Sequence, residues 1–164
     1  MPSLETLSAA DLRQVLIRFR DALQSHQEEL NRLNVYPVPD GDTGTNMTLT
    51  LETVASELRT AETMDEVCEA IAHGSLMGAR GNSGVITSQI LRGLAETFRP
   101  ADSIGPLELV AALRRSADAA GHAGRVRHLR AVLPDDGVRA ELGHIEAGLH
   151  ARALPDAADG RRAV

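Results

Sequence analysis

Apolar side chains recur at helical spacing in five successive segments of this 164-residue chain, and no other feature constrains the fold as strongly. Aromatic residues make up only 2% of the chain, so Leu, Val, Ile, Ala and Met must build the core. Such side chains suit helix-on-helix packing better than a sheet. We therefore expect an all-α fold with helices over about 8–33, 47–58, 63–71, 85–98 and 107–120.

Polar residues at the segment boundaries support these helices. Ser8 is placed to cap the first helix, with Asp11 in its first turn. Thr63 and Glu66 have the spacing of a capping box at the start of the third helix. The stretch from Gly74 to Gly84, GSLMGARGNSG, is expected to form a loop because it interrupts the apolar pattern with glycines.

Composition excludes several classes of protein. No apolar run approaches the roughly 20 residues of a membrane span, and the N-terminus lacks the basic start and apolar stretch of a signal peptide. The single cysteine, Cys68, forms no internal disulfide, which favours a cytoplasmic setting. A net charge of −6 argues against nucleic acid as a partner.

The chain contains no lysine, because all 17 basic residues are arginine. This excludes a Walker-type phosphate loop, which needs a lysine. Any phosphate site here would have to use a metal ion, backbone amides, helix N-termini or arginine.

A stiff loop, NVYPVPDGDTGTNM, places Asp40 and Asp42 on either side of a glycine. Carboxylates at this spacing can converge on Mg²⁺, which takes one or two protein carboxylates and keeps places for water and phosphate oxygens. The free amides of the following helix, around Thr45 to Met47, would favour an anion. The alternative is a solvated turn in which an acid or threonine caps the helix.

An EF-hand is excluded for this loop. With Asp40 as position one, the sixth residue is Thr45 rather than glycine, and the twelfth is Leu51 rather than glutamate.

A second glycine-rich stretch, GARGNSG, ends where the fourth helix is expected to begin. Its glycines allow the backbone to approach a ligand closely, and Ser83 adds a hydroxyl beside the helix amides. The alternative is a turn between packed helices.

The two stretches LNVYPVPDGDTGTNM and GARGNSGVITSQILRGL, in this order, closely resemble the DhaL-type kinase domain. That is the ATP-binding domain of dihydroxyacetone kinases, also found at the N-terminus of bacterial fatty acid kinases, and the first stretch is more similar to the fatty acid branch. The resemblance covers roughly residues 8–120. It implies an antiparallel helical bundle or barrel with nucleotide bound at one end.

The resemblance also implies a set of site residues. Asp40 and Asp42 match the catalytic acids that hold two Mg²⁺ ions on the ATP phosphates, and Asn34 stands nearest to where the glycerone branch has a third acid. The residues expected to bind the nucleotide are Thr43, Gly44, Thr45, Asn46, Met47, Gly81, Asn82, Ser83 and Gly84.

Beyond residue 120 the sequence departs from the family, which continues with several more helices. We therefore expect a kinase-like domain over 1–120 that is incomplete at its C-terminal end. The tail over 121–164 is expected to be poorly ordered or to form short helices, around Val138–Leu149 for example. This tail resembles either an out-of-frame translation of a GC-rich coding sequence or a divergent fragment.

By resemblance, the expected function is transfer of the γ-phosphoryl group of ATP to a fatty acid carboxylate, giving an acyl phosphate, or to dihydroxyacetone. A separate fatty-acid-binding protein would present the acyl substrate, and a homodimer is also considered. The alternatives are an inactive nucleotide-binding or partner-binding fragment and a purely structural helical protein.

Overall fold

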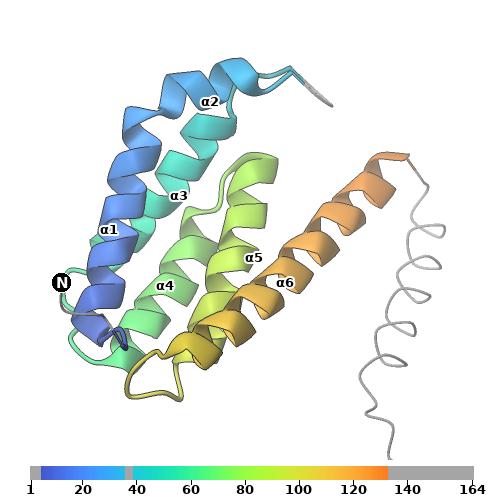
Figure 1. Ribbon diagram of the computed structural model, residues 1–164. Coiled ribbons are helices and arrows are strands. Elements are labelled where there is room, and N and C mark those ends of the chain that lie inside the picture. Colours follow the sequence, from blue (N-terminus) through green and yellow to red (C-terminus); the bar gives the residue numbers. More distant parts are fainter. Residues whose placement is uncertain (1–4, 36–38, 133–164) are drawn as a thin grey trace, which may run out of the picture. The chain divides into compact units, whose positions relative to one another are not determined.

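The computed structural model describes residues 5–35 and 39–132, and it describes the side chains of these residues as far as residue 124. It divides into two units, 1–123 and 124–164. The helices are α1 (Ala9–Ser25), α2 (Gln27–Leu33), α3 (Thr43–Glu57), α4 (Met64–Gly78), α5 (Gly81–Phe98) and α6 (Pro106–Val132), as Figure 1 shows. The described residues contain no strand, only an isolated bridge between Leu7 and Ile104. The all-α prediction is confirmed.

The helix α3 lies at the centre of the first unit, in contact with α1, α2, α4 and α5. Leu51 and Val54 of α3 and its C-cap residue Leu58 have no exposed surface. The rest of the core comes mainly from aliphatic residues of the neighbouring helices, with Cys68 and Phe98. As expected from the composition, the core is almost free of aromatic rings.

The prediction of one long first helix is wrong, because the helix bends at His26. This residue has φ −107° and ψ 10° and separates α1 from α2. No apolar residue lies between Leu23, which is buried, and Leu30, so the stretch between them has no side chain to bury on the core. The bend gives α2 its own contact with the start of α3.

The predicted loop over Gly74–Gly84 is also wrong. Its glycines lie in α4 and α5, and only Ala79 and Arg80 connect the two helices. A Cβ atom at Gly74 would lie 2.9 Å from Val54 Cα, and one at Gly84 would lie 2.7 Å from Thr50 Oγ1. Most of these glycines therefore serve close packing of α4 and α5 on α3 rather than a turn.

The last helix continues past its predicted end at Ala120 and reaches Val132. Gly121 and Gly124 do not end it, because the residues around them are mostly Ala, Arg, His and Leu. Although α6 has 27 residues, none of the described helices is both long and apolar enough to cross a membrane. The short helices considered around Val138–Leu149 lie outside the described residues.

Candidate functional site

The starts of α3 and α5 lie side by side, which brings the two sequence motifs together. Ser83 of α5 donates a hydrogen bond to the carbonyl oxygen of Thr43 in α3, at 3.4 Å. A Cβ atom on Gly81 would lie 2.2 Å from Asn46 Nδ2, so the first residue of α5 rests directly on α3. Residues about 40 positions apart in the sequence therefore meet at one end of the helical unit.

The loop before α3 carries the two candidate acids. Asn34 donates a hydrogen bond from Nδ2 to Asp40 Oδ1. Gly41 turns the chain with a φ of 65°, a backbone conformation that favours glycine. The Asp40 side chain is exposed and Asp42 is half-buried. Asn34, predicted as a metal ligand, thus contacts Asp40 through its nitrogen, which leaves only its oxygen as a possible ligand atom.

Asp42 occupies the N-cap position of α3 but does not cap it. Its side chain makes no capping hydrogen bond, and its backbone has φ −115° and ψ 0°. The capping residues Ser8 and Thr63, in contrast, have extended backbones with ψ of 172° and 163°. Aspartate is among the strongest N-cap residues. Its carboxylate is therefore left uncommitted here, as far as residues 5–35 and 39–132 show.

Two carboxylates, with the rest of the coordination left to water and ligand oxygens, fit Mg²⁺ better than they fit metals that need a full protein cage. The described residues hold no group of three or more His, Cys, Asp or Glu side chains arranged to bind a metal ion. An ion held by Asp40 and Asp42 would still need oxygens from water or from a phosphate ligand.

The predicted free amides of Thr45 to Met47 are not free, because α3 begins earlier than expected. The Thr45 N–H donates to Asn31 Oδ1 at 3.1 Å, and the Asn46 N–H donates to the Asp42 carbonyl at 2.9 Å. Within the described chain, the first-turn N–H groups of α3 without an acceptor are those of Thr43 and Gly44.

The start of α5 likewise lacks a side-chain cap. Its N-cap residue is Arg80, whose guanidinium has no acceptor atom and instead donates to the carbonyls of Met77 and Ala79, at 3.2 Å each. Gly81 has a φ of 55°. The N–H groups of Gly81, Asn82 and Ser83 have no acceptor among the described residues. Such N–H groups favour an anion, here beside the first residue of α3.

Two residues of α2 that were not predicted from the sequence help to hold this end together. Asn31 and Gln27 both donate to the Thr45 hydroxyl, at 3.0 and 3.2 Å. Neither residue belongs to either of the glycine-rich motifs. The available signal was only that two amide side chains lie one turn apart just before the stiff loop.

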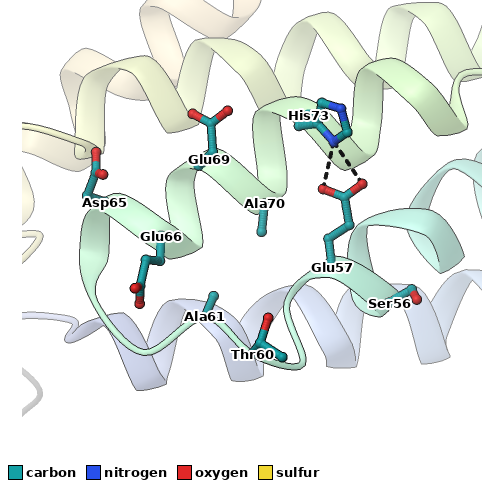
Figure 2. A pocket seen from close by; sticks show the side chains of 9 residues that line it. All are labelled: Ser56, Glu57, Thr60, Ala61, Asp65, Glu66, Glu69, Ala70 and His73. Atoms are coloured by element: carbon teal, nitrogen blue, oxygen red, sulfur yellow. Dashed lines mark hydrogen bonds and ion pairs between the residues drawn. The ribbon is translucent and has the colours of Figure 1, made fainter.

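A separate cavity of about 550 Å³ lies between the end of α3, the loop that follows it and one side of α4 (Figure 2). Its walls carry the acids Glu57, Asp65, Glu66 and Glu69, and His73 Nδ1 lies 2.9 Å from Glu57 Oε1. These acids already hold partners: Glu66 accepts backbone N–H groups, while Asp65 and Glu69 pair with Arg99. The cavity therefore has the character of a solvated acidic groove.

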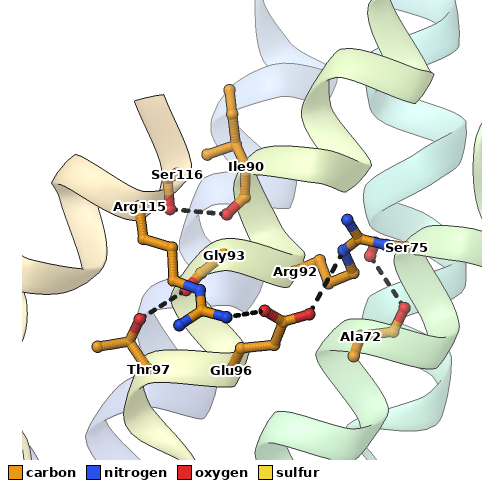
Figure 3. A network of polar contacts seen from close by, with 9 residues as sticks. All are labelled: Ala72, Ser75, Ile90, Arg92, Gly93, Glu96, Thr97, Arg115 and Ser116. Atoms are coloured by element: carbon orange, nitrogen blue, oxygen red, sulfur yellow. Dashed lines mark hydrogen bonds and ion pairs between the residues drawn. The ribbon is translucent and has the colours of Figure 1, made fainter. Parts of the chain in front are cut away.

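The polar contacts between α5 and α6 are structural (Figure 3). Ser116 donates to the Ile90 carbonyl at 2.9 Å, and Arg115 pairs with Glu96 at 2.8 Å. A Cβ atom at Gly93 would lie 2.9 Å from Ser116 Cα. These contacts fix α6 against α5 and leave the candidate site to α2, α3 and α5.

Comparison with known proteins shows which proteins this chain is similar to. The sequence model of the DAK2 domain matches residues 37–131, which include Asp40, Asp42 and the second glycine-rich stretch. Protein YloV of Bacillus subtilis is 41% identical over 120 residues, or 72% of this chain and 22% of that protein. An uncharacterized protein of Staphylococcus saprophyticus is 38% identical over 109 residues, or 65% of this chain and 20% of that protein. The chain thus spans about a fifth of the length of these relatives.

Proposed function

This chain belongs to the DAK2 domain family of kinase-related, nucleotide-binding modules, and we propose that it binds a magnesium–ATP complex where α3 and α5 begin. The membership confirms the DhaL-type resemblance of the sequence. The proposed role is that of a phosphotransferase domain in which Asp40 and Asp42 hold the two Mg²⁺ ions that the family resemblance implies.

The observation that carries the proposal is the uncapped Asp42 next to two helix starts. An aspartate at an N-cap position normally stabilises its own helix, yet Asp42 makes no capping hydrogen bond. The N–H groups of α5 that lack an acceptor begin at Gly81, which rests on Asn46 of α3. An Asp42 carboxylate without a capping role and amides without acceptors at two adjoining helix starts support a site for a cation and for phosphate oxygens.

Phosphoryl transfer needs positioning and charge neutralisation more than it needs a protein nucleophile. Bound Mg²⁺ would supply the neutralisation of phosphate charge. In our proposal Asp40 and Asp42 hold the metal, with Asn34 orienting Asp40 through its hydrogen bond. The N–H groups of Thr43, Gly44 and Gly81 to Ser83 would donate to phosphate oxygens, and Thr45, Asn46, Met47 and Gly84 would shape the two helix starts around the ligand.

For the phosphoryl acceptor we propose a fatty acid carboxylate, with an acyl phosphate as product. This choice rests on the similarity of the NVYPVPDGDTGTN stretch to the fatty acid branch, and dihydroxyacetone is the alternative acceptor. The acyl group would be presented by a separate fatty-acid-binding protein. A homodimer and a cytoplasmic setting stay predictions of the sequence.

Calorimetric titration with magnesium–ATP tests the proposed site. The substitution Asp42→Ala is expected to weaken binding at least about tenfold, or about 1.4 kcal/mol, while circular dichroism stays unchanged. Asp102→Ala is the matched control, because Asp102 is exposed and belongs to neither motif. Equal affinity of the wild-type chain and Asp42→Ala would remove the proposed metal role.

The second candidate function is nucleotide binding without turnover. An assay for ATP consumption in the presence of Mg²⁺ and a fatty acid separates the two. Binding by calorimetry with no consumption of ATP would favour the binding module over the kinase.

A further inference from the structure

The side chain of Asn31 forms two hydrogen bonds with Thr45. Asn31 Oδ1 accepts the Thr45 backbone N–H at 3.1 Å, and Asn31 Nδ2 donates to Thr45 Oγ1 at 3.0 Å. Because a backbone N–H can only donate, the orientation of the Asn31 amide is determined by this contact. Asn31 lies in α2 and Thr45 in α3, so the contact joins two helices.

The N–H that Asn31 satisfies is the one that an N-cap residue usually takes. Thr45 is the third residue of α3. In α1 and α4 the N–H at this position, of Asp11 and Glu66, donates to the N-cap side chains of Ser8 and Thr63. At α3 the same N–H donates to a side chain of another helix. Asn31 thus does for α3 what Asp42, the N-cap residue, would otherwise do.

Gly44 makes this exchange possible. A Cβ atom at this residue would lie 2.2 Å from the Gln27 carbonyl oxygen and 3.0 Å from Asn31 Oδ1. Only glycine lets the first turn of α3 come close enough to α2 for Asn31 to reach the Thr45 backbone. The second glycine of the DGDTG sequence therefore has a packing reason that is independent of any ligand.

We propose that Asn31 is a positioning residue for the metal site: it caps α3 from outside the helix and so leaves the Asp42 carboxylate free to bind a divalent cation. This inference rests on the proposed function. Without Asn31, the Thr45 N–H would turn to the side chain of Asp42, which holds the N-cap position of α3, as at an ordinary aspartate N-cap. Asp42 would then be diverted from the metal.

Amide hydrogen exchange of Thr45, measured by NMR without ligand, tests the capping. We expect Asp42→Ala to leave this exchange rate unchanged, since Asp42 does not cap. The double substitution Asn31→Ala with Asp42→Ala removes both acceptors and should speed exchange about fivefold or more. Gln27→Ala is the matched control, because the Gln27 side chain donates to the Thr45 hydroxyl and not to its backbone. Faster exchange in Asp42→Ala alone would overturn the proposal.

A second experiment tests the metal role by comparing ATP affinity with and without Mg²⁺. Asn31→Ala should reduce the gain in affinity that Mg²⁺ gives by about tenfold, with metal-free ATP binding unchanged. Asn31→Asp retains an acceptor for the Thr45 N–H and should restore the gain. In the Asp42→Ala background, Asn31→Ala should cause no further loss.

If Asn31→Ala lowers ATP affinity equally with and without Mg²⁺, Asn31 has only a structural role, and the proposed positioning role is overturned. If the wild-type chain binds no magnesium–ATP while Thr45 exchange follows the expected order, the proposed function fails and the metal role of Asn31 with it. Exchange in the wrong order together with normal binding overturns this inference alone.

Discussion

The helices of the first unit begin in two different ways at its two ends. At one end α1 and α4 begin with complete capping boxes, formed by Ser8 with Asp11 and by Thr63 with Glu66. There α6 also begins with an acceptor from its own first turn, since Glu108 accepts the Gly105 N–H at 3.0 Å. At the other end α3 and α5 begin without any side-chain cap of their own.

This difference indicates which end of the unit serves the stability of the fold and which end has groups available to a ligand. At the capped end the first-turn acids are used on the backbone of their own helices, and pairs such as Arg99 with Asp65 add further contacts. At the uncapped end Asp42 and the first amides of α5 have no such use among the described residues. Groups without an internal partner are the ones available to a ligand.

The largest loss of stability is expected from Gly44→Ala, which would disrupt the contact between α2 and α3 at the uncapped end. The new methyl group would meet the Gln27 carbonyl oxygen, and backbone cannot move aside as a side chain can. We expect a loss of about 2–3 kcal/mol in the free energy of unfolding by urea. Gly124→Ala is the control, because nothing lies within 4 Å of its added Cβ. Unchanged stability of Gly44→Ala would contradict the close contact of α2 with α3.

Gly81→Ala tests the start of α5. Its φ of 55° is costly for alanine, by about 1–2 kcal/mol of unfolding free energy. The added methyl would also displace the Asn46 side chain. Nucleotide affinity by calorimetry should therefore fall together with the denaturation midpoint. Alanine tolerated without loss of either would argue against the contact between Gly81 and Asn46.

Removing the N-cap side chain at each end in turn tests whether the two ends of the unit differ. Thr63→Ala removes a working cap and should cost about 1 kcal/mol of stability, with no change in magnesium–ATP binding. Asp42→Ala should change stability by less than about 0.5 kcal/mol while weakening that binding. Thermal unfolding and calorimetry on both variants measure the two effects. A large stability loss in Asp42→Ala would show that the two ends do not differ.

The smallest expected effect is on the loss of folding stability at acid pH. Hydrogen bonds from Ser8 lower the pKa of the Asp11 carboxyl, and those from the Thr63 and Glu62 backbone lower the pKa of Glu66. Both groups then stabilise the fold fully above their unfolded pKa values of about 4. That stability is lost as pH falls through the lower folded values. Urea midpoints measured between pH 5 and pH 2.5 should drop less steeply in Glu66→Gln than in the wild type; identical slopes would contradict the capping role of Glu66.

The sequence by itself determined the parts of the molecule that depend on residues three or four positions apart. The helical pattern, the cap at Ser8 and the capping box at Thr63 are local, and the structure confirms them. The family followed from two contiguous motifs, and the DAK2 match confirms it. The ligand roles of Asp40 and Asp42 stay predictions.

Only the tertiary structure decided what residues from distant segments do to each other. The helical glycines at Gly74 and Gly84 look like loop residues in the sequence, because nothing local shows that another backbone lies against them. Asn31 looks like an ordinary helix residue until α2 bends at His26 and meets Thr45. Close approach and capping from outside a helix depend on distances through space, and these exist only once the helices pack.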